Sequence, residues 1–292
     1  MSAQPLTKTQ VILKFTQHDR DSAGRVYVYP VLSRRAGGIS LGVNLNINNA
    51  CNWACIYCQV EGLTRGGPNP VDLNRLAEEF RSLLAEILAG DVFTADAPLD
   101  QRKLVDVAFS GNGEPTSAKE FPQAVALIYQ ILDELVPDHS LPVRLITNGS
   151  LMHRRSAREG VAMIGQRQGE VWFKLDRCLV DSARLVNGVP FDGDKVSRRL
   201  LMCAKLAPTW IQTCWLAIDG QAPGEDDQQT YLSLLKRMQQ LGADFKGVLL
   251  YGMARASASP KAARLSRLPS AVLERFAVRI QKETGLSVQV SP

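Results

Sequence analysis

The chain has 292 residues, of which 45% are hydrophobic and 22% charged, a composition ordinary for a soluble globular protein. The formal net charge of +5 is mild, so it permits an anionic partner without implying one. The first residues lack the apolar core of a secretory signal, and no run approaches the roughly 20 apolar residues that span a bilayer, so we expect a cytoplasmic protein with no membrane partner.

Short apolar runs alternate with amphipathic stretches along the chain. Residues 1–40 predict an extended lead-in with one short strand, and a helix with one apolar stripe is predicted to begin near Asp72. The last helix has Ser270 as its predicted N-cap and Gly285 as its C-terminal stop. Strands are predicted at 41–47, 104–109, 143–147, 171–176, 211–218, 245–250 and 287–290, and further helices at 125–135, 155–165, 194–206, 227–241 and 270–284.

This alternation predicts an α/β fold. Roughly six βα units in a row favour a parallel sheet with helices outside, because parallel strands need crossover connections. We therefore expect a partial (β/α)6-type barrel, with its chemistry at the C-terminal ends of the strands. The domains are predicted as an N-terminal extension over residues 1–40 and a barrel over residues 41–292, closed by a C-terminal helix and strand.

Three of the six cysteines fall within eight residues, directly after the first predicted core strand. Cys51, Cys55 and Cys58 are therefore expected in a loop at the catalytic edge of the barrel. Thiolates select zinc, copper or iron–sulfur centres. A closed zinc site needs a fourth ligand nearby, whereas this loop holds no histidine and the next cysteine is Cys178. The cluster thus favours a metal centre with one open position.

The Cys-x3-Cys-x2-Cys spacing, with the aromatic Tyr57 before the last cysteine, resembles the radical S-adenosylmethionine (SAM) signature. The resemblance implies that Cys51, Cys55 and Cys58 bind three irons of a [4Fe–4S] cluster and that SAM chelates the fourth iron. It implies that one electron, from a reductant such as flavodoxin or ferredoxin, cleaves SAM to methionine and a 5′-deoxyadenosyl radical, which abstracts hydrogen from a substrate. Tyr57 would offer its backbone to the adenine.

The second core strand runs into a loop with two glycines and a proline, Gly111, Gly113 and Pro115. Such a loop exposes backbone groups that can approach a ligand closely, and Glu114 adds an acceptor for an ammonium group. It is similar to the Gly-Gly-Glu-Pro loop of radical SAM proteins, with Asn112 between the two glycines. That similarity implies a contact with the SAM amino group.

The next two strands also end in polar residues. Thr147, Asn148 and Ser150 follow the third strand, where they are candidates for the SAM carboxylate or ribose hydroxyls. Lys174 and Asp176 lie two residues apart on the fourth strand, so they share a face and are expected to point into the barrel. The family pattern implies that Lys174 pairs with a carboxylate and Asp176 with ribose hydroxyls.

Other residues carry weaker signals. Cys178 is expected close to the catalytic edge, whereas Cys203 and Cys214 stand in apolar settings typical of packing. Candidates to line the pocket follow the fifth and sixth strands: Asp219 and Gly220 in one set, and Tyr251, Met253 and Arg255 in the other. Two basic groups, His153 with Arg154, Arg155 and Arg158, and Lys261 with Arg264 and Arg267, are more typical of a solvated surface than of an RNA contact, because no aromatic residues are interleaved with them.

The motifs together resemble compact single-domain radical SAM proteins related to the wybutosine tRNA-synthesis enzymes and to the glycyl-radical activating enzymes. The resemblance implies an enzyme that cleaves SAM reductively and abstracts hydrogen from an unidentified substrate. Two alternatives remain open. The chain is a tRNA-modifying radical SAM enzyme, although the extra segments of those members are not found here, or it is a zinc-binding interaction protein.

Overall fold

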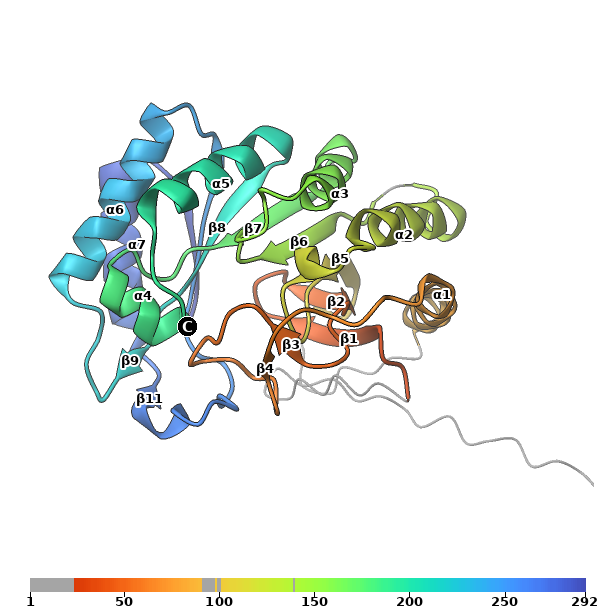
Figure 1. Cartoon of the computed structure of the whole chain (residues 1–292), viewed down its shortest axis with the longest axis horizontal. Helices are drawn as coiled ribbons and strands as arrows, with labels where there is room; N and C mark the ends of the chain where they lie inside the picture. Colours follow the sequence, from red (N-terminus) through yellow and green to blue (C-terminus); the bar gives the residue numbers. More distant parts are fainter. Residues whose placement is uncertain (1–23, 91–97, 99–100, 139) are drawn as a thin grey trace, which may run out of the picture.

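The computed structural model describes residues 24–90, 98, 101–138 and 140–292 and contains an eight-stranded sheet that curls into a partial barrel (Figure 1). The first two strands are antiparallel to each other, and every later neighbouring pair is parallel. The strands lie in the order β1 (Val28–Ser33), β2 (Gly38–Val43), β5 (Leu104–Phe109), β6 (Val143–Thr147), β7 (Glu170–Lys174), β8 (Thr209–Cys214), β10 (Phe245–Tyr251) and β12 (Val288–Ser291).

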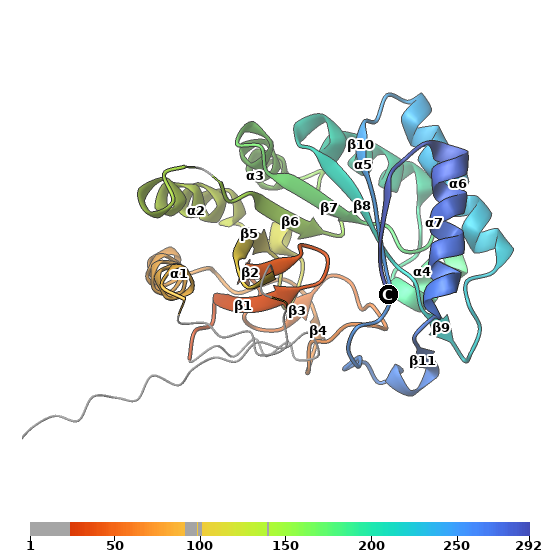
Figure 2. The same cartoon turned by 180° about the vertical axis from the view of Figure 1, so that it is seen from behind.

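Helices cover the outer side of the sheet, as Figures 1 and 2 show from opposite directions. They are α1 (Leu73–Leu88), α2 (Phe121–Leu135), α3 (Arg155–Gln166), α5 (Gly193–Leu206), α6 (Glu225–Gln240) and α7 (Ser270–Thr284). The shorter α4 (Val180–Asn187) follows β7. The loops hold two further strand pairs, β3 (Ala50–Cys51) with β4 (Thr64–Arg65) and β9 (Ala217–Ile218) with β11 (Leu265–Ser266), and two 3-10 turns, η2 (Pro115–Ser117) and η3 (Ala262–Arg264).

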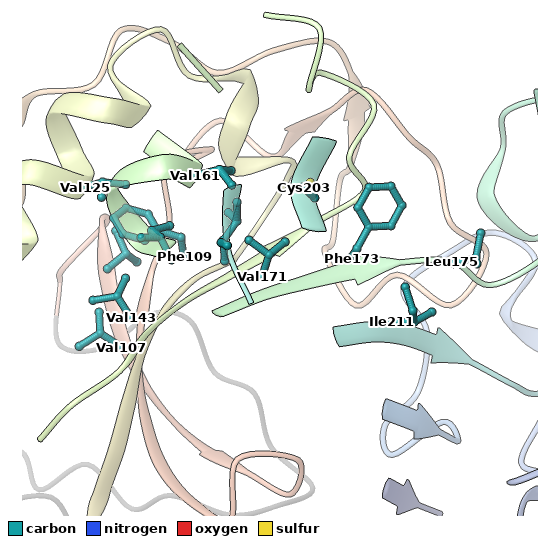
Figure 3. Close-up of a cluster of buried hydrophobic side chains, with 14 of the residues drawn as sticks. Val107, Phe109, Val125, Val143, Val161, Val171, Phe173, Leu175, Cys203 and Ile211 are labelled. Carbon is teal, nitrogen blue, oxygen red and sulfur yellow. The ribbon is translucent and has the colours of Figure 1, made fainter. Parts of the chain in front are cut away.

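Alternate residues of the parallel strands face opposite sides, because side chains of a strand alternate with period two. Val107, Val143, Val171 and Ile211 point toward the helices and are fully buried in an apolar core (Figure 3). The other face points into the barrel and carries most of its polar strand residues: Asp106, Trp172, Lys174, Gln212 and Cys214. The outer face of the sheet therefore packs against the helices in the apolar core, and the inner face lines a cavity.

The predicted fold class is confirmed, and the strand at 143–147 and the helix at 270–284 match their predicted bounds. The strand predicted at 41–47 instead ends at Val43. Asn44 and Asn46 turn the chain there, because Asn44 Oδ1 accepts from the backbone N–H of Asn46 and from that of Asn112. Short polar side chains thus replace the ladder bonds that alternation alone would predict.

Two further details differ from the sequence analysis. Ser270 is the first residue of α7 rather than its N-cap, a place that Pro269 occupies without a side-chain hydrogen bond. Gly285 does end that helix, with a left-handed φ of 73°. The expected domain boundary at residue 40 falls inside β2, so the described part of the lead-in forms the first two strands of the main sheet.

Candidate active site

The three clustered cysteines lie on one wall of a cavity of about 270 Å³ inside the partial barrel. Cys51, Cys55 and Cys58 are each half-buried, on the loop between β2 and α1. Among the described residues, no three His, Cys, Asp or Glu side chains converge on a point that would hold a single metal ion. An iron–sulfur cluster differs from a single metal ion in its ligand geometry. Each thiolate binds a separate iron, so the three sulfurs need not converge on one point. Three thiolate donors in one loop are the ligand type that iron–sulfur clusters use.

Distant segments hold the backbone of the cysteine loop from two sides. At the end of α4, the carbonyl oxygens of Asn187 and Val186 accept from the N–H groups of Ala54, at 3.1 Å, and of Ile56, at 2.9 Å. On the other side, Ser257 Oγ donates to the carbonyl oxygens of Ile56, at 2.6 Å, and of Cys58, at 3.0 Å. The positions of the thiols are thus fixed by residues more than 100 positions away.

Burial shifts the pKa values of two of these thiols. It raises the pKa of Cys51 to about 11, and it raises the pKa of Cys55 as well. Two N–H groups oppose this effect, since Trp53 N lies 3.4 Å from Cys51 Sγ and Asn187 Nδ2 lies 3.5 Å from Cys55 Sγ. Without a metal Cys51 and Cys55 are neutral thiols near pH 7, so metal binding must release their protons.

The loop after β5 approaches the cysteines with its backbone, and its glycines are required for that approach. A Cβ atom at Gly113 would lie 2.3 Å from the carbonyl oxygen of Ala50, next to Cys51. Gly111 has a φ of 126°, and a Cβ there would lie 2.5 Å from Asn44 Oδ1. Both glycines line the cavity, as does Glu114.

Glu114 connects this loop to the end of β6. Its buried carboxylate accepts hydrogen bonds from Thr116 N, Thr116 Oγ1, Thr147 Oγ1 and Asn148 N, at 2.5 to 3.2 Å. Burial raises the pKa of the Glu114 carboxyl, and the donated hydrogen bonds oppose that rise. The side chain therefore has a structural role in addition to its place on the cavity wall.

Lys174 and Asp176 meet through Tyr57. Lys174 Nζ donates to the Tyr57 hydroxyl at 2.6 Å, and that hydroxyl donates to Asp176. Asp176 also accepts from Asn187 Nδ2 and from the backbone N–H of Cys214, both at 2.7 Å. The two charged residues are together as expected, and they are linked by the side chain of Tyr57, a residue predicted at the site only for its backbone.

The structure sorts the predicted site residues into two groups. Lining the cavity with the three cysteines are Tyr57, Gly111, Gly113, Glu114, Asn148, Lys174, Tyr251, Met253 and Arg255. Behind that lining lie Pro115, Thr147, Ser150 and Asp176, which bond to or adjoin residues of the wall. Ser150, for example, accepts from Asn52 Nδ2 at 2.7 Å, in the middle of the cysteine loop.

Several expectations are corrected. Cys178 is buried in the core rather than at the cavity, whereas Cys214, expected only in packing, is buried and also lines the cavity. Asp219 lies outside the cavity and pairs with Arg264. Asn187, Gln212 and Arg35 lie at the site but were not predicted from the sequence. Only Gln212 had a signal, since it shares the strand parity that places Lys174 and Cys214 on the inner face.

Several solved protein structures have the same fold as this chain. Streptococcus suis SuiB bound to S-adenosylmethionine is 12% identical with a TM-score of 0.56, over 86% of this chain and 50% of that one. TYW1 with a lysine–pyruvate adduct bound is 17% identical with a TM-score of 0.55, over 85% and 74%. A radical SAM methyltransferase from Sphaerobacter thermophilus is 16% identical with a TM-score of 0.56, over 87% and 66%. The chain therefore has the fold of radical SAM enzymes.

Similarity at the level of sequence covers a smaller part of the chain than similarity of fold. No protein-family model matches the chain. UPF0026 protein MJ1312 of Methanocaldococcus jannaschii is 30% identical over 132 residues, which are 45% of this chain and 36% of that protein. GTPase Obg of Brachyspira hyodysenteriae is also 30% identical over 132 residues, 44% of this chain and 16% of that protein. The match thus spans well under half of either relative. Within the described residues, no helix has the length and apolar character needed to cross a membrane.

Proposed function

We propose that this chain is a radical SAM enzyme in which Cys51, Cys55 and Cys58 hold a [4Fe–4S] cluster. The observation that carries the proposal is that three half-buried cysteines in the signature spacing line a cavity inside a radical SAM fold. With one electron from a reductant such as flavodoxin or ferredoxin, the bound cluster and SAM supply a 5′-deoxyadenosyl radical that removes hydrogen from a substrate.

The residues of the chain bind and orient SAM. Gly111 and Gly113 let the loop after β5 pack closely against Asn44 and Ala50, and this packing sets its backbone on the cavity lining, where the methionine part of SAM would lie. Glu114 and Lys174 both line the cavity, so they would offer opposite charges to the amino and carboxylate groups of SAM. Asn148, whose side chain donates to Asn52 at 2.9 Å, couples the SAM-facing wall to the cysteine loop.

The test is anaerobic reconstitution of the full chain with iron and sulfide, followed by EPR of the dithionite-reduced protein with and without SAM. We expect about four irons per chain and a cluster signal that SAM alters. Cys51→Ala, Cys55→Ala and Cys58→Ala should each lose the cluster and all SAM cleavage. Cys203→Ala is the matched control, because Cys203 is fully buried in the core behind the sheet. It should keep both.

The outcomes also separate the alternatives. A colourless protein that holds zinc and is indifferent to SAM would replace this proposal with a zinc-binding module. RNA that copurifies and dissociates steeply with salt would favour a tRNA substrate. Both basic groups lie outside the cavity, and Arg155 and Arg264 are paired with Glu159 and Asp219.

A further inference from the structure

The inner face of the sheet carries buried polar groups without partners on the cavity wall. Both amide atoms of Gln212, on β8, and the indole Nε1 of Trp172, on β7, lack hydrogen-bond partners among the described residues. Gln212 is 1% exposed and Trp172 is 4% exposed. Leaving such a group buried and unpaired costs about 1–3 kcal/mol. Polar groups held at this cost on a cavity wall are expected to contact a ligand.

A cation faces the same part of the cavity. Arg35, in the turn between β1 and β2, lies 4.5 Å from the centre of the Tyr251 ring and 5.5 Å from that of Trp172. Within the part of the chain that the structure describes, no carboxylate lies within ion-pair distance of Arg35. Two aromatic faces thus hold the guanidinium in place and leave its N–H donors for another partner.

The nearby carboxylates do not neutralise Arg35. Asp106 lines the same cavity, but it forms an ion pair with Arg144, which also pairs with Glu170 at 3.1 Å. Glu170 in addition accepts from Trp210 Nε1 at 3.1 Å. These residues close a charge network of their own at the base of the inner face. Arg35 forms no ion pair with these carboxylates, so its N–H donors, rather than an excess of positive charge, are what it offers to a negative ligand.

We propose that Arg35, Trp172, Gln212 and Tyr251 form a subsite for the anionic group of the substrate, a carboxylate or a phosphate on a small organic molecule. Arg35, the Trp172 indole N–H and the Gln212 amide N–H supply donors to the oxyanion. The Gln212 carbonyl oxygen accepts from a neighbouring N–H or O–H of the same molecule. This inference rests on the proposed function for the identity of the ligand as substrate, but the site itself requires no cluster.

The experiment is calorimetric titration of the full chain, reconstituted anaerobically, with two pairs of probes of matched shape. Phenylacetate is compared with phenylacetamide, and phenyl phosphate with the neutral, tetrahedral phenyl methanesulfonate. We expect one anion of these pairs to bind and its neutral counterpart to bind at least about tenfold more weakly. The anion that binds identifies carboxylate or phosphate as the preferred group.

Three variants assign that binding to the subsite. Arg35→Gln should weaken the affinity for the anion at least about tenfold. Gln212→Glu should abolish anion binding, because the new side chain is nearly isosteric with glutamine but negatively charged. Trp172→Phe keeps an aromatic face, though a smaller one, and removes the N–H donor while Arg35 remains, so a smaller loss is expected. Arg155→Gln, on the surface of α3, is the control and should bind as the unaltered chain does.

Equal binding of anions and neutral probes, no binding of either anion, or an unchanged affinity in Arg35→Gln would overturn the proposal. So would competition by SAM, since the anion would then occupy the SAM site. A chain that takes up no cluster would refute the proposed function yet could still bind the anion through Arg35. Conversely, SAM cleavage without anion binding would refute only the subsite.

Discussion

Lys174 donates a hydrogen bond to the hydroxyl of Tyr57 at 2.6 Å, and its ammonium also lies 4.8 Å from the centre of the same ring. The two residues are 117 positions apart. The contact joins the cysteine loop to the end of β7, and the same hydroxyl continues to the buried Asp176. One phenol therefore connects a half-buried cation with a buried anion beside the thiols.

Tyr57→Phe should lower the free energy of unfolding by about 1–3 kcal/mol, because it keeps the ring and leaves Lys174 and Asp176 without their shared partner. Urea denaturation of the metal-free chain measures this loss. Tyr129→Phe is the control, since the Tyr129 hydroxyl makes one long bond of 3.4 Å to the carbonyl oxygen of Ile164. Its loss should stay below about 1 kcal/mol. Equal costs for the two variants would argue against the Tyr57 connection.

Alkylation of the folded, metal-free chain should divide the six cysteines into two groups of three. Cys51, Cys55 and Cys58 are half-buried, whereas Cys178, Cys203 and Cys214 are buried. Burial raises the pKa of Cys214 to about 12 and raises those of Cys178 and Cys203 further, so these thiols are protected by both access and protonation. They should react only after unfolding.

The pH dependence has a defined sign. The thiolate is the reactive form, and the pKa of Cys51 is raised to about 11, so its alkylation rate should rise roughly tenfold per pH unit between pH 7 and pH 10. Iodoacetamide labelling read by peptide mass spectrometry measures each cysteine separately. Rapid labelling of Cys178 or Cys203 in the folded chain would contradict the burial described above.

Asn187 is expected to tune the reduction potential of a bound cluster. Its Nδ2 lies 3.5 Å from Cys55 Sγ, and an N–H donor to a ligand sulfur stabilises the reduced, more negative state. Asn187→Leu should therefore lower the midpoint potential by up to about 40 mV, the equivalent of roughly 1 kcal/mol for one electron. A redox titration followed by EPR gives this value independently of turnover.

Ser257→Ala is the matched control for that measurement. Ser257 bonds to the carbonyl oxygens of Ile56 and Cys58 rather than to a sulfur, so the variant loosens the same loop without removing a donor to the cluster. Its potential should change less than that of Asn187→Leu. An equal shift in both variants would attribute the effect to loop position and not to the hydrogen bond.

The sequence predicted those parts of the fold and site that depend on local pattern. Period-two alternation placed Lys174 on the inner face of β7, and the cysteine spacing placed three thiols in one loop. Gly111 and Gly113 followed from the same local reasoning, since a tight loop at a strand end requires them. Each of these signals lies within a few consecutive residues, where propensity and periodicity act directly.

The features that were not predicted depend on contacts between residues far apart in the sequence. The eight-residue α4 is short and has few buried residues, so it left no apolar stripe to detect, and its last residue Asn187 went unnoticed with it. Arg35 stands in an ordinary turn, and only the curl of the sheet brings it to Trp172 and Tyr251, which follow it by more than 130 positions. No pattern within a few consecutive residues predicts such a tertiary contact.

Gly149 offers a test of how firmly the loop after β6 is held. It has a φ of 67°, and a Cβ atom there would lie 2.0 Å from the ring of Phe173 on β7. Gly149→Ala should therefore combine backbone strain with a steric clash and cost about 2–4 kcal/mol of unfolding free energy. The neighbouring Asn148 N donates to Glu114 at 2.7 Å, so a displaced loop would also disturb the connection to the loop after β5.

Gly242→Ala separates the two contributions. Gly242 also has a positive φ, of 84°, but nothing lies within 4 Å of the position of its Cβ, so only the backbone strain of about 1 kcal/mol is expected. Urea unfolding of both variants measures the difference, which reports the clash with Phe173 alone. If that difference is small, the loop after β6 yields easily, and Asn148 and Glu114 cannot be rigid parts of the cavity wall. If it reaches about 1–3 kcal/mol, the part of the cavity wall formed by Asn148 and Glu114 is preorganised by packing before any ligand binds.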